Sequence, residues 1–550
     1  MEIALQADIP TYSGGLGILA GDTLRSAADL GLSLMGVTLI SRAGYLRQEI
    51  DAQGRQIEHP EPWEPEKHLL LLGSKITLEI EDREVWVRPW LYSIEGAMGS
   101  CVPIILLDTD LEENHPEDRA ITTQLYGGDD RNRLRQEAVL GIGGIRMLAA
   151  LGLQIRAYHL NEGHSALLAM ELGKQYERVP GEISSNPCSF HIETVKECCI
   201  FTTHTPVEAG QDHFNYPLVE RQLGNEININ DLKMLAGDGE LNMSRLALNL
   251  SGYVNGVAKS HAEVSRKMFP GYSLHAITNG VHPRTWTCPS ITELYDRHIP
   301  GWLHEPDLLV RADQIPDTEL WDRHQHAKQK LIAYTDKTLN VKLDIDTPIL
   351  GFARRMTGYK RPDMLFNDIE RLLAIHDHHP FQLVLAGKAH PADQQGKDII
   401  EKIHRLIREL AGRINIVFLP DYNMSLAKIL VAGADVWLNN PIPPLEASGT
   451  SGMKAAFNGV PNLSVRDGWW TEGCIEGVTG WAIGDQSHQE HARYDADSLY
   501  DKLQHTVLPL YHGDKSSWIA VMKGAISKNA YYFNTHRMMR RYATEAYNRC

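Results

Sequence analysis

The stretch Ala434–Gly473, ADVWLNNPIPPLEASGTSGMKAAFNGVPNLSVRDGWWTEG, decides how the rest of the chain is interpreted. An apolar run that predicts a strand ends at Asn439, a proline-broken turn leads into EASGTSG, and a helix is expected from about Met453. Small residues ahead of a helix leave backbone N–H groups aimed at one point, which suits a phosphate. Lys454, in the first turn of that helix, is then placed to bind pyridoxal phosphate, an aldehyde cofactor that carries its own phosphate. A capped helix with a solvated lysine is the competing interpretation of this pattern alone.

A second stretch, ILGFARRMTGYKRPDMLF, places four cations directly after an expected strand that ends at Ala353. These are Arg354, Arg355, Lys360 and Arg361. Holding four positive charges so close together is costly unless an anion binds among them. The loop therefore indicates an anion site, although an ordinary basic loop remains the alternative.

The composition limits the class of protein. A chain of 550 residues with 43% hydrophobic and 23% charged residues is typical of a globular enzyme with two or three domains. Its net charge of −16 disfavours nucleic acid as a partner. The seven cysteines are scattered without C-x-x-C spacing, so we expect reduced thiols and no metal site. No apolar run approaches the ~18 residues of a membrane span, so a cytoplasmic enzyme without a membrane partner is expected.

EASGTSGMK followed by NG closely resembles the cofactor-lysine motif of the α-glucan phosphorylases, the family that acts on glycogen, starch and maltodextrin. The resemblance implies three catalytic residues: Lys454, which holds pyridoxal phosphate, and Arg355 and Lys360, which grip inorganic phosphate. It also implies further cofactor-binding positions, namely Thr450, Ser451, Arg354 and Tyr422.

The first half of the chain carries motifs of the same family in the same order. YSGGLGILAGD, with Gly14, Gly15 and Gly17, is similar to the glycine-rich loop that lies over the substrate phosphate. The resemblance implies sugar contacts at His204 in THTP and at Asn279 in ITNG. NEGH adds Glu162 and His164 where a strand meets a helix, a place where α/β folds bind ligands. The remaining expected sugar contacts belong to the cofactor motif: Glu446, Ser448 and Gly449.

Strands alternate with helices, and the motifs gather at the ends of strands, which is typical of a doubly wound α/β fold. We expect two Rossmann-like domains of the two-domain glycosyltransferase type, with the active site in the cleft between them. The expected N-terminal domain is 1–344 and the cofactor-carrying domain is 345–525. A final helix, 526–550, is expected to cross back to the N-terminal domain.

The resemblance implies a pyridoxal-phosphate-dependent enzyme that cleaves α-1,4-glucan with orthophosphate and releases glucose 1-phosphate. Two alternatives are a sugar-nucleotide-dependent glucan synthase of the same fold and a non-catalytic glucan-binding protein. The family usually has a short strand before the equivalent of Met1-Glu2-Ile3, which this chain lacks or has upstream. A regulatory N-terminal extension is also absent from the sequence, so a simply regulated enzyme is expected. Homo-oligomerisation and the preferred glucan length are left open.

Overall fold

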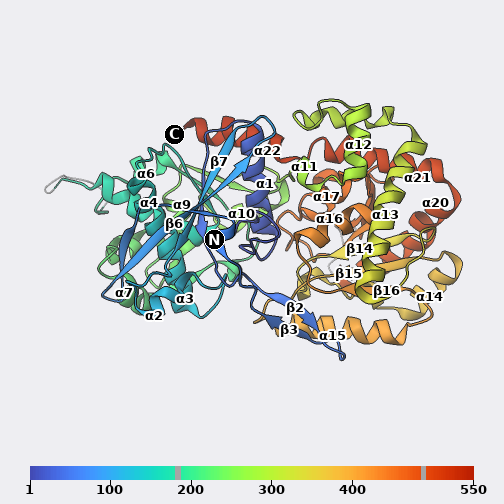
Figure 1. Ribbon diagram of the computed structural model, residues 1–550, viewed down its shortest axis with the longest axis horizontal. Helices are drawn as coiled ribbons and strands as arrows, with labels where there is room; N and C mark the ends of the chain where they lie inside the picture. Colours follow the sequence, from blue (N-terminus) through green and yellow to red (C-terminus); the bar gives the residue numbers. More distant parts are fainter. Residues whose placement is uncertain (180–186, 485–490, 550) are drawn as a thin grey trace. The chain divides into compact units, whose positions relative to one another are not determined.

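The computed structural model describes residues 1–179, 187–484 and 491–549, which form two compact units (Figure 1). Unit 1 contains Met1–Leu46, Pro60–Thr278 and Met538–Cys550, and unit 2 contains Arg47–His59 and Asn279–Arg537. None of the helices in the described part of the chain has the length and apolarity needed to span a bilayer.

Unit 2 is built on a sheet of six parallel strands in the spatial order β16-β15-β14-β17-β18-β19. The strands are β14 (Ile349–Ala353), β15 (Gln382–Ala386), β16 (Ile416–Leu419), β17 (Val436–Asn439), β18 (Asn462–Val465) and β19 (Gly480–Ile483). Every residue of these strands is buried, as expected for a parallel sheet covered on both faces. The strand order reverses between β14 and β17, so the loops after these two strands meet where such sheets bind ligands.

Twelve helices accompany the described part of unit 2. They are α11 (Pro283–Trp286), α12 (Pro289–His298), α13 (Asp317–Leu339), α14 (Ile369–His378), α15 (Gln394–Glu409), α16 (Met424–Gly433), α17 (Ser451–Ala456), α18 (Trp470–Gly473), α19 (His491–Lys502), α20 (Leu508–Gly513), α21 (Lys515–Gly524) and α22 (Thr535–Arg541), whose last residues enter unit 1.

The compact units divide at Thr278–Asn279, which differs from the expected boundary at 344/345. The reason lies in α13, which precedes the first strand of the sheet but packs into it. Lys328 of α13 is fully buried, and its Nζ lies 2.8 Å from the buried carboxylate of Asp435, just before β17. His324, one turn earlier, donates from Nε2 to the same carboxylate at 2.9 Å. A buried ion pair of this kind fixes α13 to the sheet, because separating it would leave a charge without a partner.

A hairpin from the first part of the chain also belongs to unit 2. Strands β2 (Arg47–Ile50) and β3 (Gln56–His59) pair antiparallel. The Gln48 side-chain amide donates to Gly387 O at 2.9 Å, and Gln56 exchanges hydrogen bonds with the backbone of Ala389 at 2.9–3.0 Å. The two glutamines therefore bind the backbone just beyond β15, a long-range attachment that the expected division at 344/345 does not include.

Unit 1 contains two main sheets. The first is parallel, in the order β13-β12-β9-β8, and the second is mixed, in the order β1-β7-β6-β4 with β5 paired to β6. Their strands are β1 (Gly36–Leu39), β4 (Leu70–Leu71), β5 (Ile76–Ile80), β6 (Arg83–Glu95), β7 (Cys101–Asp108), β8 (Tyr158–Asn161), β9 (Cys199–Thr202), β12 (Tyr253–Gly256) and β13 (His275–Ala276); β10 (His213–Asn215) and β11 (Glu240–Asn242) form a separate pair.

The helices of unit 1 cover these sheets. They are α1 (Gly15–Asp29), α2 (Pro116–Arg119), α3 (Asp130–Ala138), α4 (Gly144–Ala150), α5 (Leu167–Gly173), α6 (Ile192–Cys198), α7 (Tyr216–Leu223), α8 (Ile229–Ala236), α9 (Met243–Asn249) and α10 (Lys259–Met268). The end of the chain joins the same core, where Met538, Met539 and Tyr542 are buried with residues of α1 and β7.

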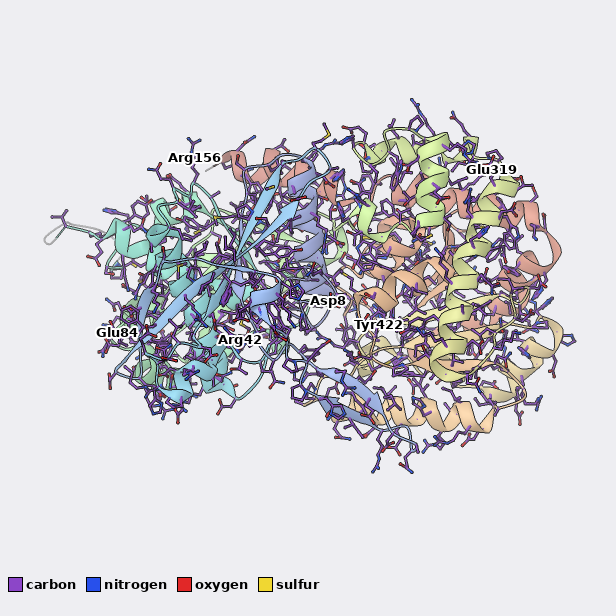
Figure 2. All side chains as sticks on the ribbon, viewed as in Figure 1. Asp8, Arg42, Glu84, Arg156, Glu319 and Tyr422 are labelled. Atoms are coloured by element: carbon purple, nitrogen blue, oxygen red, sulfur yellow. The ribbon has the colours of Figure 1, made fainter. Side chains whose placement is uncertain are left out.

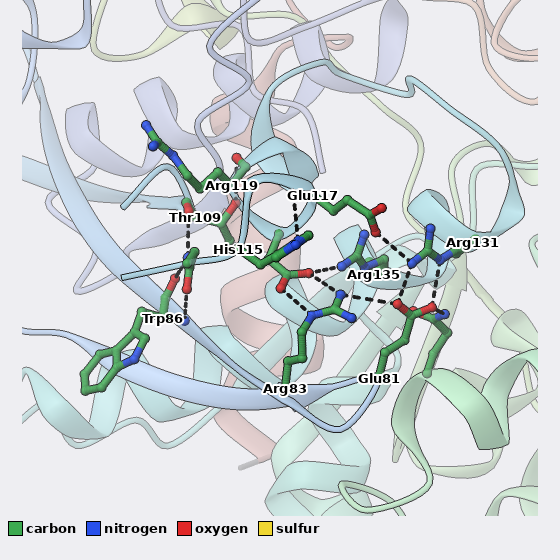
Figure 3. Close-up of polar contacts among 12 residues, drawn as sticks. Glu81, Arg83, Trp86, Thr109, His115, Glu117, Arg119, Arg131 and Arg135 are labelled. Atoms are coloured by element: carbon green, nitrogen blue, oxygen red, sulfur yellow. Dashed lines mark hydrogen bonds and ion pairs between the residues drawn. The ribbon is translucent and has the colours of Figure 1, made fainter. Parts of the chain in front are cut away.

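A network of arginines and carboxylates fixes the turn between β5 and β6 (Figure 3). Glu81 has a positive φ of 52°, which is unusual for a residue other than glycine. Its carboxylate accepts hydrogen bonds from Arg131 of α3 and from Arg83. Asp118 in turn bonds Arg83 and the buried Arg135. Arg131 also pairs with Glu117 at 3.1 Å, so three arginines face three carboxylates, and these paired charges explain how the strained turn is held.

Candidate active site

The loops after β14 and β17 bring three charged side chains of unit 2 together. Arg354 follows β14, and its Nη2 donates to Glu446 Oε2 at 2.6 Å. Lys360 of the same loop donates to the same carboxylate oxygen. Glu446 is 92 residues from Arg354 in sequence, and the two meet because β14 and β17 are neighbours in the sheet. The basic loop therefore surrounds an anion, which here is a carboxylate of the chain itself.

Burial and charge determine how these groups ionise. Burial opposes ionisation of Glu446, but the charges of Lys360 and Arg354 outweigh it and lower the pKa of the carboxyl to about 2. Burial, helped by the charge of Arg354, lowers the pKa of Lys360 to about 7 although Glu446 acts in the opposite direction. Nε and Nη1 of Arg354 are buried and have no hydrogen-bond partner among the described residues. A ligand with several acceptor oxygens, such as phosphate, would satisfy these donors.

The other two cations of the loop differ in role. Arg355 is exposed, and its positive charge contributes to lowering the pKa of Lys360. Arg361 instead donates to the carbonyl oxygens of Asn440 and Pro441 and pairs with Asp495 at 2.6 Å. Arg361 is therefore a structural residue, which leaves Arg354, Arg355 and Lys360 to face a ligand.

Lys454 lies on α17, as expected, and is only 6% exposed, so the interpretation as a solvated lysine does not hold. Its Nζ lies 3.9 Å from the ring centre of Trp286. Asn458 donates from Nδ2 to Lys454 O at 3.0 Å and to Trp286 O at 2.8 Å, which fixes the helix beside that ring. A Cβ at Gly452 would overlap the side chain of Asn462, so the turn ahead of the lysine is tightly packed.

The residues present fit pyridoxal phosphate. The buried amine of Lys454 beside the Trp286 ring is placed for the covalent attachment of an aldehyde, since lysine amines form Schiff bases with carbonyl groups. Ser448 Oγ is buried and lacks a partner among the described residues, so the turn before α17 also offers polar atoms to a ligand. Gly449 has φ of +73°, a conformation that glycine adopts without strain.

The other predicted residues of unit 2 have different surroundings. The side chain of Ser451 is engaged with the sheet, since its Oγ accepts from Trp437 Nε1 at 3.0 Å, whereas Thr450 caps α17 without a side-chain hydrogen bond. Tyr422 follows β16 (Figure 2). Asn279 Oδ1 is buried with no hydrogen-bond partner in the described structure, and its backbone oxygen accepts from Arg537 at 2.9 Å.

Sequence reasoning missed Asp467, which follows β18. Its Oδ2 accepts the backbone N–H of Glu446 at 2.8 Å, and it is 5% exposed. A carboxylate two residues beyond the end of an apolar run was the available signal, but the sequence does not reveal that β18 lies beside β17.

In unit 1, Glu162 organises the turn that contains His204. Glu162 follows β8 with φ of +71°, and its Oε2 accepts from the N–H of His204 at 2.7 Å and from the Thr205 hydroxyl at 3.1 Å. Burial raises the pKa of Glu162 to about 7. His204 Nε2 bonds Asn161 Oδ1, and burial lowers the pKa of this histidine well below its usual value. The structure thus brings Glu162 and the neutral ring of His204 into one polar cluster.

His164 belongs to a separate cluster. A possible ligand atom of His164 and carboxylate oxygens of Glu137 and Asp212 all lie within 4.8 Å of one another. Arg133 supplies the positive charge among these three side chains. Its guanidinium lies 2.8 Å from His164 Nδ1, 2.9 Å from Asp212 and 2.9 Å from Glu137. Burial and the charge of Arg133 lower the pKa of His164 to about 3. With this arginine in place, the cluster is not arranged to receive a metal ion.

Of the glycines expected in the glycine-rich loop, Gly14 is the N-cap of α1, whereas Gly15 and Gly17 lie within the first turn of that helix. The backbone N–H groups of Ser13 and Gly14 donate to the carboxylate of Glu2, which Tyr126 also contacts at 3.1 Å. The N-terminal end of α1 therefore already holds an anionic group. An added Cβ on Gly17 would lie 2.7 Å from Glu2 and from Tyr12, whereas one on Gly15 would meet nothing within 4 Å.

Comparison with known proteins agrees with the motifs. Residues 207–473 match the family described as Carbohydrate phosphorylase. The maltodextrin phosphorylase of Thermococcus litoralis is 38% identical over all of this chain and 70% of the relative. The glycogen phosphorylase of Aquifex aeolicus is 36% identical over all of this chain and 85% of its own length. An uncharacterized protein of Methanocaldococcus jannaschii is 30% identical over all of this chain and 98% of its own length.

Proposed function

The chain belongs to the carbohydrate phosphorylase family, and we propose that it catalyses the phosphorolysis of α-1,4-glucan with orthophosphate to give glucose 1-phosphate. The names of its relatives support glycogen and maltodextrin as the class of substrate. Pyridoxal phosphate is part of the proposal, supported by the buried Lys454 and the packed glycine turn ahead of it.

The main support for phosphate chemistry is the set of unpaired donors on Arg354. Arg354 has two buried donor nitrogens without partners in the described structure, and it lies beside the buried Lys360 at the reversal point of the sheet. Glu446 satisfies only one edge of this guanidinium. An incoming phosphate could take the remaining donors, and a charged hydrogen bond of this kind contributes about 1.5–3 kcal/mol.

The proposed reaction joins an oxygen of phosphate to the anomeric carbon of the terminal glucose as the glycosidic C–O bond breaks. A proton must reach the leaving oxygen, so that the shortened glucan departs as an alcohol. Arg355 and Lys360 would hold the substrate phosphate and offset its charge. Arg354, predicted as a cofactor-binding residue, has unpaired donors that could bond this phosphate or the phosphate of the cofactor. The cofactor phosphate, when bound, would supply a proton-transferring group beside the substrate phosphate. Lys454 would anchor the cofactor and take no proton itself.

We assign sugar recognition to polar groups that can still form hydrogen bonds. Asn279 Oδ1 and Ser448 Oγ are buried without partners in the described chain, so each could bond a glucose hydroxyl. Glu446 could also accept one once phosphate takes over its cations, with the backbone N–H of Gly449 as a donor. From unit 1 we propose His204 and Glu162 as sugar contacts and the Gly14–Gly17 loop as a phosphate contact. His164 is less suited to this role, because Arg133 and Asp212 already engage its Nδ1.

The finer architecture is also proposed. We propose two Rossmann-like domains of the glycosyltransferase type. For the domain in unit 2, the support is the six parallel strands and their order. In unit 1, the four-stranded parallel sheet supports a related arrangement, although a mixed sheet accompanies it.

The deciding experiment is an assay of the purified protein with maltodextrin and phosphate, with and without added pyridoxal phosphate. We expect glucose 1-phosphate to form, and to form faster once the cofactor has been supplied to cofactor-depleted protein. Glucan extension from a sugar nucleotide, with no release of glucose 1-phosphate, would instead support the synthase. Glucan binding without either reaction would support a non-catalytic protein.

A further inference from the structure

Asp467 is a buried carboxylate whose hydrogen bonds go to the backbone. Its Oδ2 accepts the N–H of Glu446 at 2.8 Å, and its Oδ1 accepts the N–H of Gly468 at 2.8 Å. Burial, with a contribution from the charge of Glu446, raises the pKa of Asp467 to about 7, while the charge of Lys360 acts in the opposite direction. A carboxylate kept in so unfavourable an environment suggests that its acceptor oxygens have a specific task.

Two further contacts join the loop after β18 to the loop after β17. The N–H of Trp469 donates to Ser448 O at 2.8 Å. Gly468 has φ of +53°, and a Cβ there would overlap Ser448 O, so the two backbones approach as closely as glycine permits. Residues Asp467–Trp469 therefore hold the backbone of Glu446–Ser448 at three points.

We propose that Asp467 is a positioning residue of the active site, which fixes the backbone of Glu446 while the Glu446 carboxylate changes partner. This inference rests on the proposed function. In the structure, Arg354 and Lys360 hold the Glu446 side chain. Phosphate would compete for those two cations during the reaction. The bond from Asp467 does not depend on them, so it keeps the turn in place when the side chain is released toward the sugar.

The test compares Asp467→Asn and Asp467→Ala with the intact enzyme. Asparagine retains one oxygen that can accept the Glu446 N–H, whereas alanine retains none. We expect Asp467→Ala to lower kcat/KM for glucan by about tenfold or more, the loss of one charged hydrogen bond. Asp467→Asn should recover part of that loss, and the cofactor content of both variants should match the wild type. Asp497→Asn is the control, because its side chain is 59% exposed and pairs with Arg371 of α14.

Hydrogen exchange supplies a readout that does not require activity. The Glu446 amide should exchange faster in Asp467→Ala than in the wild type, with Asp467→Asn between them and Asp497→Asn unchanged. Unchanged exchange at Glu446 in folded Asp467→Ala would overturn the proposal. So would a fall in melting temperature with kcat/KM for glucan retained. If the wild type forms no glucose 1-phosphate, the proposed function fails, and amide exchange still decides whether Asp467 positions the turn.

Discussion

Arg354 Nη2 lies 2.6 Å from Glu446 Oε2, so the carboxylate of one strand loop occupies the cationic loop of its neighbour. A carboxylate and a phosphate oxygen are equivalent partners for a guanidinium. Glu446 thus keeps Arg354 and Lys360 compensated while competing with any anion that binds them. The relationship makes phosphate affinity depend on a residue that is itself negatively charged.

Replacing Glu446 with glutamine should therefore strengthen phosphate binding. Loss of the competing charge is expected to tighten phosphate roughly tenfold, and to slow turnover of glucan because the sugar contact is lost. Thermal shift against phosphate concentration measures the first effect, since the stabilisation by a ligand grows with the logarithm of its concentration divided by its Kd. Glu409→Gln, at the exposed end of α15, serves as control. An equal phosphate-induced shift in Glu446→Gln and the wild type would contradict the competition.

Arg355→Ala should raise the KM for phosphate by roughly tenfold, because an exposed guanidinium at the mouth of the cation cluster contributes one charged hydrogen bond. Cofactor absorbance should stay unchanged, since Lys454 lies on a different element, α17. Initial rates at varied phosphate provide the measurement. Arg413→Ala is the matched control, with a side chain 54% exposed and only a distant ion pair at 3.9 Å. Phosphate kinetics that are the same in both variants would remove Arg355 from the site.

Borohydride reduction of the holoenzyme should fix the cofactor to Lys454. Peptide mapping is expected to find the label on the peptide that contains Lys454 and on no other. Lys454→Ala should yield no labelled peptide, while Lys337→Ala, at the exposed end of α13, should label normally. A label on another lysine in active wild-type protein would refute the assignment.

The glycine-rich loop offers a contrast between two neighbouring glycines. Gly15→Val should leave the melting temperature nearly unchanged, because a Cβ there meets nothing within 4 Å, yet reduce turnover if phosphate approaches this backbone. Gly17→Ala should lower stability by about 1–3 kcal/mol, because its Cβ would press against Glu2 and Tyr12. Melting temperature and turnover, measured on both variants, separate the two effects. Full turnover in Gly15→Val would argue against a role for this loop in phosphate binding.

His159 should make unit 1 sensitive to acid. Burial beside Tyr542 and Tyr547 lowers the pKa of His159 to about 4, so the folded protein resists a proton that the unfolded chain accepts below about pH 6.5. Stability from this group is therefore lost as pH falls from about 6.5 to about 4, by at most about 1.4 kcal/mol per pH unit.

Melting temperatures at pH 7 and pH 5 test this dependence. His159→Asn is expected to lose less stability between the two pH values than the wild type, although it starts lower because the bonds to Tyr547 and Thr202 are weakened. His115→Asn, at an exposed helix cap, should follow the wild type. An identical fall in melting temperature from pH 7 to pH 5 in the wild type and His159→Asn would show that this histidine does not cause the loss of stability in acid.

The local arrangement of the candidate site can be predicted from the sequence because its motifs are short. Lys454, Ser448 and Gly449 lie within seven residues, and the order of a tight turn and a helix follows from their side chains alone. The same holds for Arg354 and Lys360 after a strand of buried apolar residues. Such short-range features depend on backbone preferences and burial patterns, which a sequence displays directly.

Only the tertiary structure decided which of these local features meet. Glu446 reaches Arg354, and Asp467 reaches Glu446, because hydrogen bonding places β17 between β14 and β18. Other long-range contacts place the 47–59 hairpin in unit 2, through Gln48 and Gln56, and fix α13 to the sheet, through Lys328 and Asp435. Strand order and the pairing of distant charges are set by the packing of the whole core, so no short stretch of sequence contains them.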